Sequence, residues 1–321
     1  MEQINDLKAV LYSKRANIFY LEKCRVMAKD GRVVYLTQER NIYAYYNIPI
    51  ANTTFILLGT GTSITQSAMR MMCSAGVMVG FSGTDGTPFF AGTEIEWVSP
   101  QSEYRPTDYV QQWLSFWFDD QKRLNAGKEF QYARIEYIIK IWSKDRQFNE
   151  CGLYDDDIEV QRALKQYKNG IDKAEDVNQL LLYEARFTKH LYKIVCSKAH
   201  VEFFERDRDS KDNINVLLNH GNYLAYGLAA VTLWALGIPH GFPVMHGKTR
   251  RGALVFDVAD LVKDAIVLPL AITSGSVGAS SNEFRAECIK YFTDYKTLDY
   301  MFDKVKVVAS QLSVGDVNQC L

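Results

Sequence analysis

The segment SPQSEYRP, residues 99–106, separates two parts of the chain that differ in character. It is polar and contains two prolines, which interrupt helices and strands alike. Before it, short apolar runs alternate with turn residues, whereas after it a helical period continues to the end of the chain. The sequence therefore predicts an α+β protein, with a small β-rich domain over residues 1–100, a linker over 101–106 and a larger α-helical domain over 107–321.

The N-terminal part is predicted to form a small sheet with one helix. Asp30-Gly31 is a strong signal for a hairpin turn between two of its strands. Ser63 or Thr65 can cap the helix. Strands are expected where β-branched and aromatic residues cluster, at residues 17–21, 24–28, 32–36, 41–46, 53–58 and 77–81.

The segment GTGTSIT, residues 59–65, is similar to a dinucleotide-binding turn because a strand, glycines and a helix start follow one another. It lacks the third glycine, its strand belongs to a run that looks antiparallel, and no acidic residue follows on a second parallel strand. A tight turn that requires Gly59 and Gly61 is therefore favoured, and nucleotide binding stays a minor alternative.

The C-terminal part has the periodicity of a helical domain. Residues 213–247 contain no Asp, Glu, Lys or Arg, and their apolar centre at 223–238 must be tested as a membrane span. This centre is shorter than the about 20 residues that spanning requires, and Pro239 closes it. A helix buried within the domain is therefore expected, with no membrane association. Helices are predicted over 107–125, 129–147, 158–168, 176–204, 213–237, 257–273, 283–292 and 296–312.

Composition excludes several classes of protein. With 47% hydrophobic and 23% charged residues among 321, the chain is typical of a globular protein and not of a disordered one. Its six cysteines form no CxxC motif for zinc or redox chemistry. The N-terminus lacks the apolar core of a secretory signal, so a cytoplasmic location is expected. The net charge of −1 means that any nucleic-acid surface must be a local patch.

Glu184 occupies a position where the helical period predicts an apolar residue. Asp176 can cap this helix, and its apolar stripe continues on both sides of Glu184, at Leu181 and Phe187. A carboxylate on a buried face needs a cation, a hydrogen-bond partner or a solvent-filled cleft. From this residue alone, a structural ion pair with Arg or Lys and a functional site are equal alternatives.

The segment HGKTRRGALVFDVADLVKD, residues 246–264, places Asp257, Asp260 and Asp264 on one face of a predicted helix. A solvated face helped by the helix dipole can explain three neighbouring carboxylates. A bound divalent cation is the sharper explanation, with His246 as the imidazole ligand and His240 as its competitor. Carboxylates with one imidazole suit Mg²⁺ or Mn²⁺, whereas zinc more often takes two histidines or a thiolate.

Two groups of basic residues flank these candidate ligands. Lys248, Arg250 and Arg251 follow His246 directly and could hold phosphates close to a metal ion, although such a loop is often only solvated. A second group, at Arg186, Lys189 and Lys193, faces nearly opposite Glu184 on the predicted helix. It is interpreted as a solvated face or as a DNA contact remote from the metal ligands. The combination of acidic residues, histidine and basic residues favours metal-assisted phosphoryl transfer.

These motifs together resemble a known family. The chain is similar to the universal adaptation integrase and metal-dependent DNA endonuclease of CRISPR systems, the first-numbered CRISPR-associated protein, and most similar to its subtype I-F members. The resemblance covers essentially the whole chain. Its motifs are SKRANIFYL (13–21), NIPIANTTFILLGTGTSITQSAM (47–69), PQSEYRP (100–106), EAR (184–186), LNHGNYLAYGLAA (218–230), GIPHG (237–241), HGKTRRG (246–252) and LVFDVADLVKD (254–264).

The resemblance implies a division of labour between the two domains. The β-rich domain would dimerise and the helical domain would catalyse, with Glu184, His246 and Asp260 as metal ligands and Asp257 as a supporting carboxylate. Two homodimers would be bridged by a second adaptation protein, which in subtype I-F is fused to the helicase-nuclease. The assembly would capture short foreign DNA (spacers), double-stranded or branched, and join its 3′-hydroxyl ends to the repeat array by transesterification.

Two rival functions remain open at this stage. One is a non-catalytic DNA-binding scaffold whose acidic cluster is purely structural. The other is a metal-dependent hydrolase of a small phosphorylated substrate. Strand joining that depends on the acidic residues would separate the integrase from both.

Overall fold

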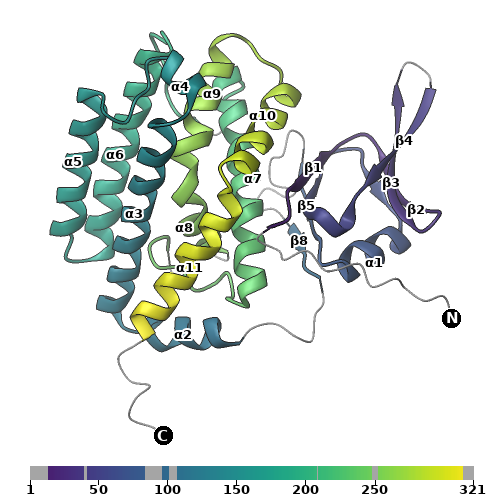
Figure 1. Ribbon diagram of the computed structural model, residues 1–321, viewed down its shortest axis with the longest axis horizontal. Coiled ribbons are helices and arrows are strands. Elements are labelled where there is room, and N and C mark those ends of the chain that lie inside the picture. Colours follow the sequence, from purple (N-terminus) through teal and green to yellow (C-terminus); the bar gives the residue numbers. More distant parts are fainter. Residues whose placement is uncertain are drawn as a thin grey trace, which may run out of the picture. The chain divides into compact units, whose positions relative to one another are not determined.

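The chain folds into two compact units, residues 1–105 and 106–321. The computed structural model describes residues 14–39, 42–83, 96–100, 107–207, 209–247 and 252–313. Within these residues, the first unit holds the β-strands and one α-helix, and the second holds the remaining α-helices (Figure 1). The predicted α+β class is confirmed. The predicted linker, 101–106, lies outside the described residues.

The β-rich unit contains two four-stranded sheets and the helix α1 (Gln66–Ser74). One sheet has the order β1 (Asn17–Leu21), β5 (Thr53–Leu58), β7 (Met78–Phe81) and β8 (Glu96–Val98). The other has the order β4 (Ile42–Ile48), β3 (Arg32–Glu39), β2 (Arg25–Lys29) and β6 (Ser63–Ile64). A core of Val, Ile, Leu and Met side chains joins the two sheets to α1.

The expectation of an antiparallel arrangement around residues 53–58 is wrong. β5 pairs in parallel with both β1 and β7, and only β8 is antiparallel in that sheet. All residues of β5 are buried. A continuous apolar run is typical of a central parallel strand, and this feature of TTFILL indicated the parallel arrangement.

The two predicted turns of this unit are present. Asp30 and Gly31 take φ angles of +50° and +71°, and Lys29 pairs with Arg32 across the hairpin between β2 and β3. In GTGTSIT, Gly61 has φ +73°, and a Cβ atom on Gly59 would lie 2.5 Å from the Tyr20 hydroxyl. The segment therefore forms a tight turn that requires both glycines. Thr65 caps α1 and accepts a hydrogen bond from the backbone N of Ala68.

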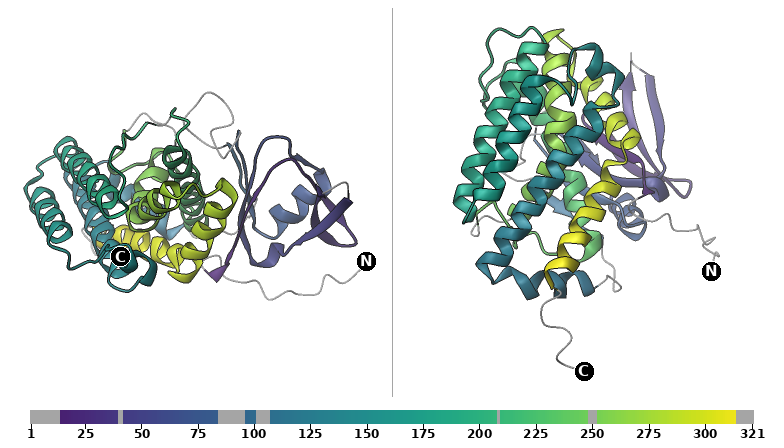
Figure 2. Two further views of the ribbon diagram at one scale, coloured as in Figure 1. Left: turned by 90° about the horizontal axis from the view of Figure 1, so that it is seen from above. Right: turned by 60° about the vertical axis from the view of Figure 1, so that its left-hand side comes forward.

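The helical unit is built around α7, which packs against α8, α9, α10 and α11. The helices α5 and α6 lie side by side next to α3 in both views of Figure 2. A π-helical segment, Lys263–Val267, connects α8 to α9. The helices are α2 (Asp108–Trp117), α3 (Asp120–Trp142), α4 (Arg146–Glu150), α5 (Ile158–Lys173), α6 (Val177–Lys198), α7 (Asn213–Leu236), α8 (Ala253–Val262), α9 (Leu268–Ser276), α10 (Ser281–Asp294) and α11 (Thr297–Ser313).

The uncharged stretch forms α7, as predicted. Sixteen of its 24 residues are buried, and it ends at Gly237, which has φ +73°. A helix that is apolar on all sides is typical of a protein interior. Within the described residues, no helix is both long enough and apolar enough to cross a membrane.

The boundary predicted between the first two helices is wrong. The sequence placed it near residues 126–128, but the break lies at Phe118 and Asp119. The Asp119 carboxylate accepts hydrogen bonds from the backbone N of Gln121 and Lys122, which caps α3. Gly127 lies within α3, where a Cβ atom would come 3.0 Å from Met245 Cγ. This glycine therefore permits close packing and does not end a helix.

The single helix predicted over 257–273 is also wrong. It begins earlier, at Ala253, and the π-helical segment interrupts it before Pro269. Proline lacks an N–H, so it cannot donate the helical hydrogen bond to the carbonyl four residues earlier, and its ring clashes with that carbonyl. That carbonyl belongs to Ala265, and it accepts a hydrogen bond of 3.1 Å from the Trp142 indole instead. The wider turn therefore follows from Pro269.

The other predicted elements match within a few residues, with three larger differences. The helix predicted over 176–204 ends at Lys198, and His200 has φ +55°, which does not continue a helix. The helix predicted over 158–168 extends to Lys173. The helix predicted over 129–147 ends at Trp142. The short elements α4, β6 and β8 were not predicted.

Candidate active site

The sequence-predicted acidic residues gather where α3, α6, α8 and the π-helical segment meet. Asp257, Asp260 and Asp264 are 1%, 5% and 6% exposed, so the interpretation as a solvated face is wrong. The cluster contains four carboxylates, those of Glu184 and the three aspartates, and two cationic side chains, Arg134 and Lys263. With a neutral imidazole at His246, its net charge is −2.

Asp257 anchors the loop that carries His246. Its Oδ2 accepts hydrogen bonds from the backbone N of Val244 (2.7 Å) and Met245 (3.2 Å). Its Oδ1 accepts one from the backbone N of His246 at 3.1 Å and lies 2.7 Å from the imidazole Nδ1. Both carboxylate oxygens are therefore engaged. This arrangement fixes the imidazole ring and leaves Nε2 for another partner.

That partner is Asp260, one helical turn after Asp257. His246 Nε2 lies 3.8 Å from Asp260 Oδ2, and the Lys263 ammonium pairs with Asp260 Oδ1. Burial acts to raise the pKa of Asp260, but Lys263, His246 and Arg134 outweigh it and lower that pKa. Burial also acts to lower the pKa of His246, and Asp257 and Asp260 reverse this effect and raise it. The site thus places cationic groups between its carboxylates.

Glu184 forms the ion pair that one of the two sequence interpretations required. Its Oε1 accepts hydrogen bonds from Arg134 Nη1 (2.8 Å) and Thr188 Oγ1 (2.9 Å). Arg134 comes from α3 and also donates from Nε to Asp264 Oδ2 at 2.8 Å. Burial acts to lower the pKa of Arg134, but Asp264 and Glu184 keep it well above its usual value.

Sequence reasoning missed Arg134. Its position in α3 is flanked on the same face by the buried residues Phe130, Gln131 and Ile138. An arginine on a buried helix face is the same kind of anomaly as Glu184, so the signal was available in the sequence. Which carboxylate it would meet could not be derived, because α3 and α6 are separate helices.

The donor set fits a hard divalent cation in type and charge. Carboxylate oxygens with one imidazole suit Mg²⁺ or Mn²⁺, and with the neutral imidazole that metal binding requires, the net charge of −2 matches one such ion. Two ligands about 2.1 Å from one ion lie about 3 to 4 Å apart, which accommodates His246 Nε2 and Asp260 Oδ2. Within the described residues, however, no three His, Cys, Asp or Glu side chains are grouped as a ready metal site. Glu184 is held by Arg134 instead.

Other predicted site residues fall outside this cluster. Lys248, Arg250 and Arg251 lie outside the described residues. His240 does not take the place of His246: it is hydrogen-bonded to the backbone of Ala230, and burial lowers its pKa.

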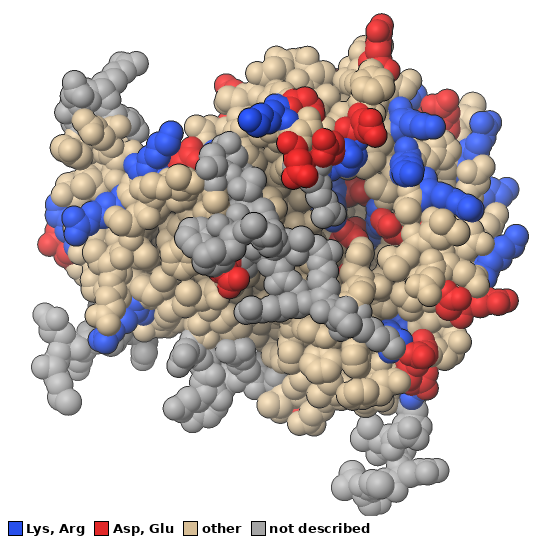
Figure 3. All heavy atoms as spheres, turned by 180° about the vertical axis from the view of Figure 1, so that it is seen from behind, with Lys and Arg blue, Asp and Glu red and all other residues tan. Residues whose placement is uncertain are grey.

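The second basic group is exposed, as its position opposite Glu184 predicted. Figure 3 shows Lys and Arg gathered along its right-hand edge, over the face that α5 and α6 form. The positive charge of this face is therefore remote from the acidic cluster. Its exposed members are Arg162, Lys165, Lys168 and Lys173 of α5 and Arg186, Lys189 and Lys193 of α6.

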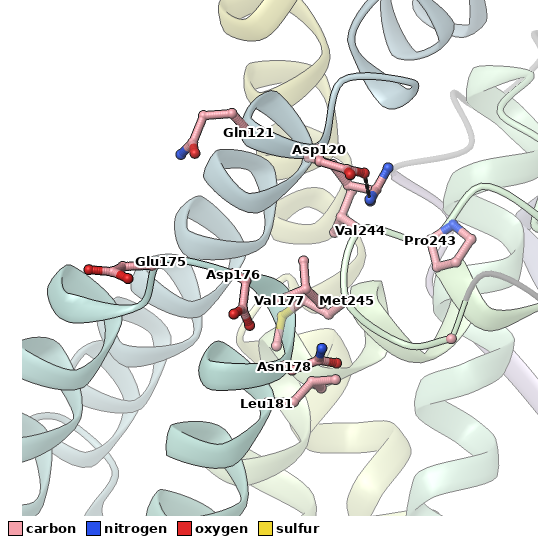
Figure 4. Close-up of a pocket in the computed structure, with 12 residues that line it drawn as sticks. Asp120, Gln121, Glu175, Asp176, Val177, Asn178, Leu181, Pro243, Val244 and Met245 are labelled. Atoms are coloured by element: carbon pink, nitrogen blue, oxygen red, sulfur yellow. Dashed lines mark hydrogen bonds and ion pairs between the residues drawn. The ribbon is translucent and has the colours of Figure 1, made fainter.

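A pocket of about 420 Å³ opens beside the loop that carries His246. Figure 4 shows it between the first turns of α3 and α6 and the segment 243–247. Its charged lining is mainly acidic, with Asp120, Glu175 and Asp176, and its Arg123 is paired with Asp120. Such a lining repels phosphate, so the described residues of this pocket do not suit a small phosphorylated substrate.

Comparison with known sequences places this cluster in a family context. Residues 19–286 match the family described as CRISPR associated protein Cas1. The CRISPR-associated endonuclease Cas1 of Pectobacterium atrosepticum (strain SCRI 1043) is 50% identical over 315 residues, which cover 96% of this chain and 97% of that protein. Its counterpart in Pseudomonas aeruginosa (strain UCBPP-PA14) is 48% identical over 317 residues, with 97% and 98% covered.

Solved structures share the fold at low sequence identity. A CAS1 protein from Thermotoga maritima superposes with a TM-score of 0.71 at 15% identity, over 92% of this chain and 96% of that one. A casposase bound to integration product gives 0.67 at 12% identity, over 92% and 91%. A Cas6-RT-Cas1–Cas2 complex gives 0.65 at 14% identity, where 94% of this chain matches 36% of the other.

Proposed function

The chain belongs to the CRISPR-associated Cas1 family, and on this premise we propose that it is a divalent-metal-dependent DNA endonuclease and integrase. It inserts short foreign DNA (spacers) into a CRISPR array by transesterification from 3′-hydroxyl ends. The observation that carries the proposal is the His246–Asp260 pair inside a buried acidic cluster, in which Asp257 holds His246 in place. Relatives named as endonucleases and a casposase neighbour support the same class of reaction.

Each residue of the cluster has a separate task in this mechanism. Glu184, His246 and Asp260 would hold Mg²⁺ or Mn²⁺, and the ion would supply positive charge that stabilises the phosphate during the reaction. Asp257 fixes the imidazole so that Nε2 faces Asp260. Lys248, Arg250 and Arg251, which follow His246 in the sequence, are proposed to contact DNA phosphates without reading bases.

One observation favours the rival scaffold function. Arg134 and Lys263 already pair with carboxylates of the cluster, as they would in a purely structural core. Both the enzyme and the scaffold function therefore predict a stable acidic cluster. They differ in whether a metal ion bound there supports cleavage and joining of DNA. A measurement of metal-dependent chemistry separates them.

Strand joining is expected to require a divalent cation. Purified protein is incubated with supercoiled plasmid and a short duplex that carries free 3′-hydroxyl ends, in EDTA, Mg²⁺ or Mn²⁺. Joined and nicked products should form only with Mg²⁺ or Mn²⁺, because the carboxylates of the cluster outnumber Arg134 and Lys263, and the remaining negative charge repels the transferred phosphate. DNA binding without joining under every metal condition would support the scaffold and overturn the enzyme.

The proposed partners are DNA, a second copy of the chain, and a second adaptation protein that in subtype I-F is fused to the helicase-nuclease. The Cas1–Cas2 content of one structural neighbour supports the last of these. A cytoplasmic location is proposed because the substrate is intracellular DNA.

If the β-rich unit carries the homodimer, its exposed tyrosines should contribute. Tyr43 and Tyr45 are 66% and 50% exposed on β4, which is an edge strand. Tyrosine is a frequent hot-spot residue at interfaces, so changing both to Glu should raise the dimer dissociation constant at least about tenfold. Sedimentation of the full chain measures this, with Tyr154→Glu in the helical unit as control. A dimer of unchanged affinity would move the interface away from β4.

A further inference from the structure

Arg134 makes more hydrogen bonds to the cluster than Lys263 does, and its partners outside α3 come from two elements, α6 and the π-helical segment. It extends from α3, and its side chain is 3% exposed. Nη1 donates to Glu184 Oε1, Nη2 donates to Thr188 Oγ1 at 2.7 Å, and Nε and Nη2 both donate to Asp264. The guanidinium thus joins α6 to the π-helical segment.

The hydrogen bonds around Glu184 form a closed ring. Thr188 accepts a hydrogen bond from Arg134 and donates one of 2.9 Å to Glu184 Oε1, the same oxygen that Arg134 contacts. Two donors therefore hold Oε1. Within the part of the chain that the structure describes, Oε2 has no hydrogen-bond partner.

We infer that Arg134 is a positioning residue: it fixes Glu184 through Oε1 and thereby leaves Oε2 available to the cation of the proposed reaction. The inference rests on the proposed function and adds a residue to it. A planar guanidinium suits this task because its donors have a fixed fork geometry, which a lysine ammonium lacks. Partners of this kind usually orient metal ligands and tune metal affinity.

Asp264 explains how the Arg134 guanidinium can lie beside a site for a divalent metal ion. A guanidinium next to a metal ligand should repel the metal ion. Asp264 is buried and takes two donors from Arg134, so the pair is neutral as a unit. Its place in the π-helical segment follows from Pro269. The third aspartate of the sequence motif therefore serves Arg134 and is not a metal ligand in this arrangement.

The direction in which divalent-cation affinity changes when Arg134 is replaced separates two roles of this residue, the positioning of Glu184 and a purely electrostatic effect. If Arg134 acted only through its charge, removing it would tighten the binding of a divalent cation. If it positions Glu184, its removal should weaken that binding. Arg134→Lys keeps the charge and loses the fork, and Thr188→Val removes one hydrogen bond to Oε1 with no change of charge.

The test is calorimetric titration of the full-length protein with Mn²⁺, without DNA, together with the thermal unfolding midpoint. Arg134→Lys should raise the Mn²⁺ dissociation constant about 10- to 100-fold, and Thr188→Val about 3-fold in the same direction. Strand joining by both should recover as Mn²⁺ is raised. Arg285→Lys is the matched control: this buried arginine of α10 contacts Asn282 and His220, so its change should lower the midpoint and leave Mn²⁺ affinity unchanged.

Three outcomes decide the matter. Weaker Mn²⁺ binding by both variants, with the control unaffected, supports the inference. Unchanged or tighter binding by folded Arg134→Lys and Thr188→Val shows that Arg134 is only a structural ion pair, and leaves the proposed function intact. Failure of the wild type to bind Mn²⁺ contradicts the proposed function itself. If Arg134→Lys does not fold, Thr188→Val alone decides.

Discussion

Asp260→Asn should abolish strand cleavage and strand joining, with a loss of about 10³-fold or more at saturating Mg²⁺ or Mn²⁺. Oδ2 of this carboxylate is the atom that faces His246 Nε2. Asp257 cannot replace it, because both oxygens of Asp257 are engaged by the loop. The measurement is the initial rate of joining and nicking by wild type and variant on the same substrates.

Stability must be separated from chemistry in this test. Asp260→Asn leaves the partly buried Lys263 ammonium without its carboxylate, so the unfolding midpoint should fall as well. The double variant Asp260→Asn with Lys263→Met removes both charges and should recover stability without recovering activity. Asp145→Asn is the matched control, since this buried carboxylate caps α4 and contacts Tyr295, and neither residue belongs to the cluster.

The affinity of Asp260→Asn for DNA is the second quantity to measure. Removal of one negative charge should leave the binding of a short duplex unchanged or tighten it, because the variant still presents the same basic residues. Joining at the wild-type rate by Asp260→Asn would contradict the mechanism. In that case the cluster would be a structural core, and the scaffold function would stand.

The division of the chain into strands and helices could be predicted because it depends on local patterns. The Asp30-Gly31 hairpin, the glycine turn before α1 and the apolar α7 each follow from residues close in sequence. The parallel order of β1, β5 and β7 could not be derived in the same way, since it joins strands separated by other elements. The buried character of TTFILL was its only local sign.

The candidate site shows the same limit. Glu184 could be singled out because one charged residue interrupts an apolar stripe, and His246 and Asp260 because acidic residues recur at helical spacing. Their partners are long-range: Arg134 lies 50 positions before Glu184 and 130 before Asp264. The π-helical segment also had a local cause in Pro269, but its effect depends on Trp142 in another helix.

Asp257→Asn should damage both the fold and the reaction, for a different reason from Asp260→Asn. The carboxylate of Asp257 accepts three backbone N–H groups and faces the imidazole Nδ1. An asparagine turns one acceptor oxygen into a donor, which leaves buried N–H groups facing an NH₂ group. The free energy of unfolding should fall by about 2 to 4 kcal/mol. Joining should fall about 100-fold, because the imidazole of His246 loses the partner that fixes its orientation.

The dependence of the joining rate on Mn²⁺ concentration then shows whether Asp257 anchors His246 or is itself a metal ligand. If Asp257 only orients His246, all proposed ligands survive in Asp257→Asn, and raised Mn²⁺ should restore much of the joining rate at a temperature where the variant is folded. Asp260→Asn lacks a ligand and should not recover. Circular dichroism at the assay temperature confirms the fold, and Asp145→Asn again controls for the loss of a buried carboxylate. Wild-type stability and wild-type joining by Asp257→Asn would contradict its role as an anchor, whereas a loss that no Mn²⁺ concentration relieves would make Asp257 a metal ligand in its own right.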